Sequence, residues 1–158
     1  GFYEKSKINN QFIDHRRLAC QQISNIDSKK RLKFAEIKPG FLLGNSLNFL
    51  AFNNENKDYF FGIYAICNSI LLDWFFKVTS SNNHINNYQI DLFPIPASEK
   101  KIERLGKFLR EVYFKKDNLK NRHLLEHNIL ETYECLEYKK ILIANHPKGH
   151  ELLNVETL

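Results

Sequence analysis

The sequence contains no methionine, even at its first position, and it has few glycines and prolines, six and four among 158 residues. The missing initiator methionine predicts a piece of a longer protein. No internal repeat or low-complexity linker is visible, and a hydrophobic content of 43% is enough for one buried core. We therefore expect residues 1–158 to form a single domain.

Cysteine is scarce and widely spaced. The three cysteines, Cys20, Cys67 and Cys135, form no C-x-x-C pair, and their number is odd. This pattern argues against a disulfide framework and is typical of reduced thiols in a cytoplasmic protein. The amino end also lacks the apolar segment of a secretory signal.

A long uninterrupted hydrophobic run is missing as well. The longest apolar stretch, residues 59–76, is interrupted by Asn68, Ser69 and Asp73. An aspartate at the centre of a bilayer costs roughly 2.5 to 3.5 kcal/mol on insertion scales. We therefore expect a buried helix of a globular core and no membrane partner.

Hydrophobic periodicity predicts an α+β fold, in which antiparallel strands at the amino end pack on a long buried helix and two amphipathic helices follow. We expect the following elements: strands at 16–23, 31–37 and 46–52, the long helix at 59–78 with Asp58 as its N-cap, and a short edge strand at 88–96. A second helix, capped by Ser98, should bury Ile102, Leu105, Leu109 and Val112. A third should run from about 117 to about 138, burying Leu125, Ile129, Thr132, Tyr133 and Leu136. The tail, 141–158, is expected to be a closing strand or partly without regular structure.

The most informative segment is an uncharged loop directly after the long predicted helix. Residues 80–87 read SSNNHINN, and all but one of their side chains donate or accept hydrogen bonds. Asn and Gln pair well with the major-groove edge of adenine. We predict these base-reading residues: Asn82, Asn83, His84 and Asn86, with Gln21 and Gln22 as secondary candidates. The alternative is that several of them cap helices and turns.

Positive charge favours a polyanionic partner. The formal net charge is +5 and the sequence pI is about 9.1. Lysines and arginines flank the predicted hairpin and precede the polar loop, where they would contact DNA phosphates. These phosphate candidates are Arg16, Arg17, Lys29, Lys30, Arg31, Lys33 and Lys77. The alternative is that they form an ordinary solvated face.

The segments around the loop form a recognisable pattern: Asn68-Ser69, then Trp74-Phe-Phe-Lys77, the Ser/Asn loop, Asn86-Asn-Tyr88 and Leu92-Phe-Pro-Ile-Pro96. The pattern resembles the target-recognition domains of restriction-modification enzymes. The nearest are the TaqI-like C-terminal specificity domains of N6-adenine DNA methyltransferases and fused type II restriction enzymes, and type I specificity subunits are more distantly similar. The resemblance covers residues 16–113 approximately. It implies a domain that binds double-stranded DNA sequence-specifically beside upstream methyltransferase or nuclease domains.

The catalytic motifs of such enzymes are missing from this chain. An adenine methyltransferase needs an Asn/Asp-Pro-Pro-Tyr/Phe loop, but the only prolines are Pro39, Pro94, Pro96 and Pro147. No P-D…E-x-K arrangement nominates a metal-dependent nuclease centre either. We therefore expect no cofactor in this domain, whereas S-adenosylmethionine and Mg²⁺ would belong to other domains of a parent protein.

Two other readings remain open at this point. His123, Glu126 and His127 spell H-x-x-E-H, which on a helix places two imidazoles on one face as zinc ligands of a hydrolase. A third metal ligand would have to come from the short segment 134–156. The last reading is a non-catalytic protein-interaction module whose helices dock onto a partner.

Overall fold

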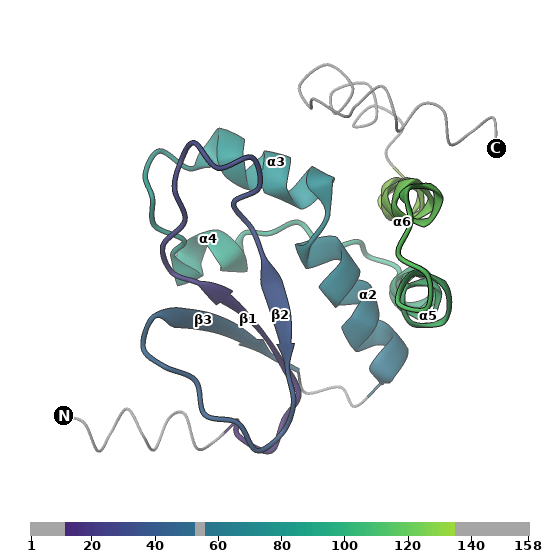
Figure 1. Ribbon diagram of the computed structural model, residues 1–158, viewed down its shortest axis with the longest axis horizontal. Coiled ribbons are helices and arrows are strands. Elements are labelled where there is room, and N and C mark those ends of the chain that lie inside the picture. Colours follow the sequence, from purple (N-terminus) through teal and green to yellow (C-terminus); the bar gives the residue numbers. More distant parts are fainter. Residues whose placement is uncertain (1–11, 53–55, 135–158) are drawn as a thin grey trace.

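The computed structural model describes residues 12–52 and 56–134. Three strands come first, β1 (Arg17–Gln21), β2 (Phe34–Ile37) and β3 (Leu47–Ala51), and they form an antiparallel sheet in the order β2-β1-β3 (Figure 1). Leu18 pairs with Glu36 on one side and with Leu50 on the other. The helices follow the sheet, so the fold is α+β as the sequence predicts.

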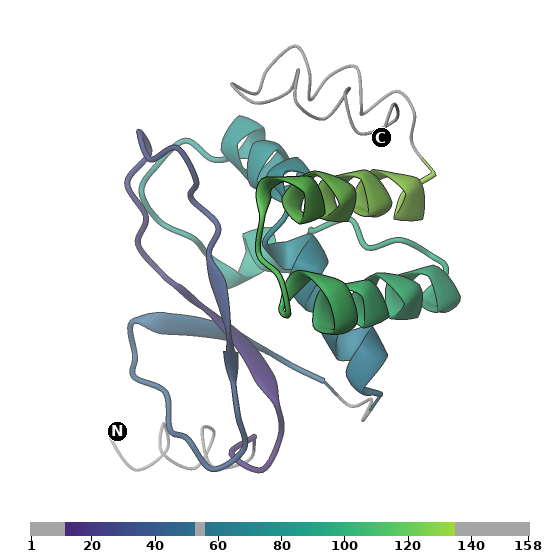
Figure 2. The ribbon, with the colours of Figure 1, turned by 45° about the vertical axis from the view of Figure 1, so that its right-hand side comes forward.

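Six helical segments follow the sheet in the part of the chain that the structure describes. They are α2 (Lys57–Cys67), α3 (Ile70–Thr79), α4 (Asn87–Asp91), α5 (Glu99–Phe108), the π-helical turn η1 (Leu109–Tyr113) and α6 (Leu119–Thr132). Helix α2 lies between the sheet and the pair α5 and α6, which run side by side (Figures 1 and 2). The predicted extension of α6 to residue 138, with Leu136, and the tail 141–158 lie outside the described residues.

The single long helix predicted at 59–78 is wrong, because the chain bends between α2 and α3. Asn68 ends α2, and the hydroxyl of Ser69 accepts a hydrogen bond from the backbone N–H of Leu72 at 3.1 Å, which starts α3 as a new helix. Asn56, not Asp58, caps α2 through its side-chain oxygen. No single helix in the described ranges is long and apolar enough to cross a membrane; α2 and α3 together reach that length and composition but are bent by 52°.

The predicted edge strand at 88–96 is also wrong, since α4 occupies its first half. Asn86 is the N-cap residue, and its backbone N–H donates to Oε1 of Gln89 at 2.9 Å, which is half of a capping box. The helix ends before Pro94, where a proline without an N–H makes a natural break. This short helix therefore fastens the polar loop from its carboxyl side.

The main core lies between the sheet and α2, where Leu18, Phe34 and Ile66 are among the buried side chains. On its other side α2 packs closely on α5, because two glycines face each other across the contact. A Cβ atom at Gly62 would lie 2.1 Å from the carbonyl oxygen of Ile102, and one at Gly106 would lie 1.7 Å from that of Asp58. The two backbones approach each other more closely than any side chain would allow.

Helices α5 and α6 begin where the sequence predicts. The hydroxyl of Ser98 accepts from the N–H of Lys101 at 3.3 Å, and Asn118 caps α6 through its bond to the N–H of Asn121 at 2.8 Å. The predicted inward positions are buried at Ile102, Leu105, Leu109, Leu125, Ile129 and Thr132, whereas Tyr133 is only partly buried and Val112 is 36% exposed. Val112 lies in η1, where the wider π-helical turn shifts the register of the buried face.

Candidate nucleic-acid interface

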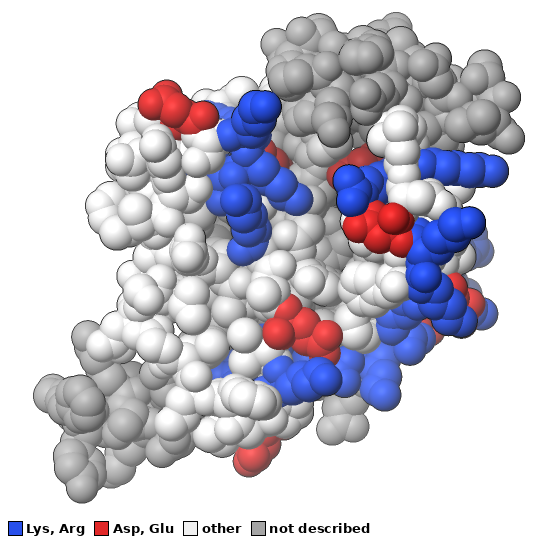
Figure 3. Space-filling model, viewed as in Figure 1, with Lys and Arg blue, Asp and Glu red and all other residues white. Residues whose placement is uncertain are grey.

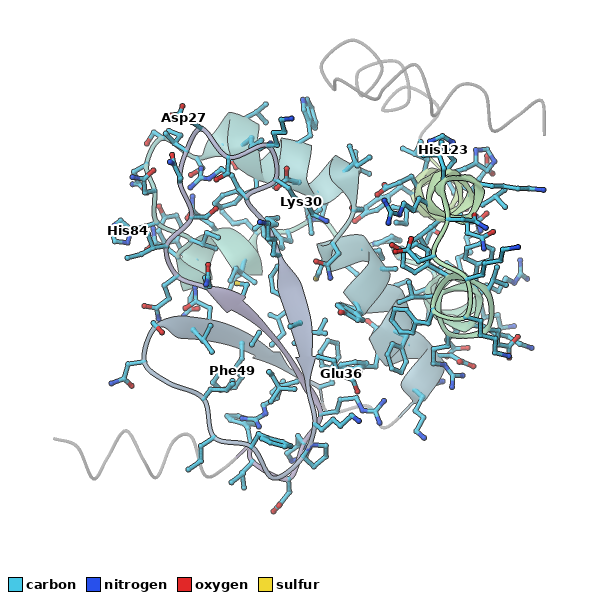
Figure 4. The ribbon with its side chains drawn as sticks, in the orientation of Figure 1. Asp27, Lys30, Glu36, Phe49, His84 and His123 are labelled. Atoms are coloured by element: carbon cyan, nitrogen blue, oxygen red, sulfur yellow. The ribbon has the colours of Figure 1, made fainter. Side chains whose placement is uncertain are left out.

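Two loops that are distant in the sequence lie side by side at one edge of the molecule. They are residues 21–28, which begin at the last residue of β1, and residues 80–87, which follow α3; together we call them the loop platform. The N–H of Ser24 donates to Asn83 O, and the N–H of Ile85 donates to Gln22 O, each at 2.8 Å. An isolated antiparallel bridge joins Ile23 to His84. In Figure 4, Asp27 and His84 mark the two loops at the same edge.

A buried arginine holds the platform from beneath. The guanidinium of Arg31 donates to the carbonyl oxygens of Ser24 at 3.1 Å and of Asn82 at 2.6 Å, and to the hydroxyl of Ser80 at 2.9 Å. The guanidinium also lies 4.8 Å from the ring centroid of Phe76, and Arg31 is only 2% exposed. Burial lowers the pKa of Arg31, and the nearby Asp73 partly offsets that effect. One cation thus fixes both loops.

The carboxylate of Asp73 extends this network into α3. Its Oδ1 atom accepts from the backbone N–H groups of Arg31 and Leu32, each at 2.8 Å, and its Oδ2 atom lies 3.1 Å from Nζ of Lys77. The Lys77 ammonium also donates to the carbonyl oxygen of Lys29. These contacts explain why β2 begins at Phe34 and not at residue 31 as predicted: the preceding N–H groups bond to α3 and not to a strand.

The two amides at the centre of the loop are exposed, and each has a structural bond. Oδ1 of Asn82 accepts from the N–H of His84 at 2.9 Å, and Oδ1 of Asn83 accepts from the N–H of Ile26 at 2.8 Å. Within the described residues neither Nδ2 atom makes a hydrogen bond. Each amide therefore stabilises the platform with its oxygen and presents its nitrogen as a donor.

The other base-reading candidates divide into two groups. His84 and Gln21 are exposed at the platform. Gln22 is half-buried and donates through Nε2 to Oδ1 of Asn48 at 3.2 Å, while Asn86 caps α4. The structure thus leaves Gln21, Asn82, Asn83 and His84 accessible on the two loops, and it gives Gln22 and Asn86 supporting positions.

Most of the predicted phosphate candidates are engaged within the protein. Arg17 is 1% exposed and donates to the carbonyl oxygen of Phe41, and Arg31 supports the platform. Arg16 lies 3.4 Å from the carboxylate of Glu36 and 5.4 Å from the ring centroids of two phenylalanines, Phe60 and Phe61. These three arginines consolidate the fold.

The four lysines among these candidates differ from one another. Nζ of Lys30 donates to the carbonyl oxygen of Asn68 at 2.5 Å, and burial lowers the pKa of Lys30. Lys77 pairs with Asp73. Lys29 and Lys33 are exposed, so they are the candidates whose ammonium groups are accessible from solvent.

A second group of cations was missed by the sequence reasoning. Residues 99–122 contain nine Lys and Arg against four Asp and Glu. Figure 3 shows Lys and Arg over α5 and α6 on the right of the view and a separate group over α3 and the loop before β2, whereas the left-hand edge is mostly uncharged. The charge pattern of that segment was readable in the sequence, but its separation from the polar loop required the fold.

The H-x-x-E-H motif lies on α6, and its glutamate has a structural role. Both carboxylate oxygens of Glu126 accept from the backbone N–H of Ile70, at 3.1 and 3.2 Å, at the amino end of α3. Burial raises the pKa of Glu126 to about 7 despite this bond and the nearby Lys30. Nε2 of His127 lies 3.7 Å from Glu131. Among residues 12–52 and 56–134, no three His, Cys, Asp or Glu side chains form a group that could hold a metal ion.

No family model matches the chain, and comparisons with curated proteins and with solved structures find no similar protein.

Proposed function

We propose that this chain is a sequence-specific recognition domain for double-stranded DNA that serves a restriction-modification enzyme, an adenine methyltransferase, an endonuclease or both. The observation that supports this best is the loop platform: exposed donors and acceptors, uncharged except for Asp27, on two loops that a buried Arg31–Asp73 network holds in place. A rigid, hydrogen-bonding surface of this kind suits the reading of base edges, because its groups are positioned before the partner arrives.

The roles of affinity and specificity divide between two sets of residues. Gln21, Asn82, Asn83 and His84 would face base edges, and the exposed Lys29 and Lys33 would contact phosphates near the platform. Arg17, Arg31, Gln22 and Asn86 support these groups from within. The parent protein would supply the chemistry through upstream domains that use S-adenosylmethionine or Mg²⁺, and such an enzyme would work in the cytoplasm.

The zinc-hydrolase reading finds less support. The carboxylate of Glu126 faces the amino end of α3 and accepts hydrogen bonds from Ile70. A general base of a zinc enzyme would instead have to face the metal-bound water. The protein-interaction reading has no specific contact in its favour, and the binding experiment below separates it from DNA recognition.

The test is binding of the 158-residue chain to a pool of duplexes with a randomised centre, titrated with salt. We expect sequence enrichment after repeated selection, and a logarithmic affinity that falls linearly with the logarithm of salt concentration. Lys29→Ala and Lys33→Ala should each reduce the slope by about 0.9. Lys100→Ala, on the exposed side of α5, removes the same charge far along the chain from the platform and should leave the slope unchanged.

Two results would contradict the proposal. Binding whose affinity does not fall with salt would remove the phosphate contacts and favour a protein-interaction module. A slope that responds to Lys100→Ala but to neither platform lysine would move the DNA contact to α5 and away from the polar loops.

A further inference from the structure

The loop platform exposes two large aliphatic side chains beside its amides. Ile23 is 62% exposed and Ile26 is 45% exposed, and both belong to the loop that follows β1. Single exposed hydrophobic residues are common on protein surfaces. These two differ because they lie next to groups that hydrogen-bond: Ile23 bridges to His84, and the N–H of Ile26 donates to the side chain of Asn83.

The contact between Ile26 and Asn83 fixes the orientation of the amide. Oδ1 of Asn83 accepts from the Ile26 N–H at 2.8 Å, so the exposed amide leaves its Nδ2, a donor, for a partner, and the residue that makes this bond, Ile26, is itself an exposed aliphatic residue. In the major groove, thymine presents an acceptor, O4, beside the C5-methyl group. The two surfaces are complementary in chemistry: a donor meets an acceptor, and an apolar side chain meets a methyl group.

The other bases match this pair less well. Cytosine presents a donor, N4, where thymine presents O4, so it would face the Asn83 donor unfavourably. Guanine presents the acceptors N7 and O6, and adenine presents the acceptor N7, but neither base offers a methyl group to the Ile26 side chain. The platform therefore favours a target that contains A·T pairs.

We propose that Ile26 and Asn83 together read a thymine in the recognised sequence, with Nδ2 of Asn83 donating to O4 and the Ile26 side chain contacting the C5-methyl group. This inference rests on the DNA-recognition function proposed above and adds the chemistry of one recognised base. Ile23 extends the apolar surface on the same loop.

The experiment uses the 158-residue chain and the duplex selected from the randomised pool, in which we expect at least one required A·T pair. Each required thymine is then replaced in turn by deoxyuridine, which lacks only the methyl group, or by 5-methylcytosine with guanine opposite it, which keeps the methyl group and replaces O4 by an amino donor. At one position deoxyuridine should weaken binding about fourfold, which corresponds to one buried methyl group. At that same position 5-methylcytosine should weaken binding more than deoxyuridine does.

Two variants test whether Ile26 causes the preference for thymine over deoxyuridine. In Ile26→Ala the preference for thymine over deoxyuridine should disappear, while binding to the deoxyuridine duplex stays close to that of the unchanged chain. Leu119→Ala removes an aliphatic side chain of similar exposure, 57%, at the start of α6, and it should keep the preference.

The outcomes separate this inference from the proposed function. Sequence-selective, salt-dependent binding that shows no difference between thymine and deoxyuridine at any position would overturn the thymine contact and leave DNA recognition standing. A thymine preference that survives in Ile26→Ala would overturn the assignment to this residue pair. A pool from which no sequence is enriched would overturn both.

Discussion

The loop platform and the α2–α5 contact are held together in opposite ways. The platform depends on polar groups: one buried guanidinium and one buried carboxylate bond to the backbone of two loops. The α2–α5 contact depends on the absence of side chains, because Gly62 and Gly106 allow the two helices to touch backbone to backbone. The first arrangement leaves hydrogen-bonding groups exposed at the surface, and the second produces a rigid base.

This difference teaches how an uncharged loop can be fixed without a hydrophobic core of its own. The platform has few buried apolar side chains, although Ile85 is only 2% exposed. Buried ionic groups are costly to desolvate, so they stabilise a structure only when they are well bonded. Asp73 meets this condition, and Arg31 meets it through Nη1 and Nη2, although its buried Nε has no hydrogen-bond partner. The platform should therefore be sensitive to the loss of one polar atom, whereas the helices should be sensitive to the gain of one carbon atom.

The largest effect is expected at the helix contact. In Gly106→Val the new Cβ atom would lie 1.7 Å from the carbonyl oxygen of Asp58. This clash should lower the free energy of unfolding by more than about 3 kcal/mol or prevent folding. Urea unfolding followed by circular dichroism measures this change. Gly44→Ala is the control, since a Cβ there meets nothing within 4 Å. Equal stability of the two variants would contradict the close contact.

A somewhat smaller loss of stability is expected when the polar network around Arg31 and Asp73 is broken. Asp73→Ala leaves the N–H groups of Arg31 and Leu32 without their acceptor, and it should cost about 2 to 3 kcal/mol. Hydrogen exchange should accelerate at these two amides before it changes in α2. Asp91→Ala, at an exposed position at the end of α4, is the matched control and should alter neither quantity.

The pH dependence of stability tests the contact between α6 and α3. Burial raises the pKa of Glu126 to about 7, above its ordinary value of 4.5, so the folded state holds the proton more tightly than the unfolded state. The free energy of unfolding should therefore fall as the pH rises between these two values, by roughly 1 to 3 kcal/mol. Glu126→Gln should remove this part of the dependence. An unchanged profile in that variant would assign the effect to other groups.

The smallest effects on stability are expected at the exposed edge of the platform. His84→Ala should change the free energy of unfolding by less than about 0.5 kcal/mol, because the imidazole is exposed. Asn83→Ala should cost about 1 kcal/mol, because the N–H of Ile26 loses its partner. Thermal unfolding of both variants gives the comparison. A larger loss for His84→Ala than for Asn83→Ala would reverse the roles that we assign to the two side chains.

Much of the fold follows from local patterns in the sequence. The three strands, the cap Ser98, the start of α6 near residue 117 and most buried positions of α5 and α6 were predictable, because alternation, capping residues and helical spacing act over a few neighbours. The bend at Ser69 was missed although a serine in an apolar run is a possible N-cap, since the hydrophobic pattern continues through it. The edge strand was mistaken for the same reason: alternation outweighed the capping signal of Asn86 and Gln89.

The candidate site was predictable in composition but not in detail. The sequence identifies the segment 80–87 as polar and uncharged. It does not show which loop lies beside this segment, or which atom of each amide faces solvent. Whether Arg31 contacts a phosphate or supports a loop depends on its burial, which results from the packing of Phe76 and the position of Asn82. No spacing rule connects residues so far apart in the chain.

The sequence by itself determined the class of the fold, the helix and strand content at most positions and the polar character of one loop, because these properties depend on neighbouring residues. The tertiary structure alone decided which cations are buried, which amide atoms are accessible, and that Glu126 supports a helix end at Ile70. The physical reason is that burial and hydrogen-bond partners are set by contacts between segments that fold together from distant parts of the chain.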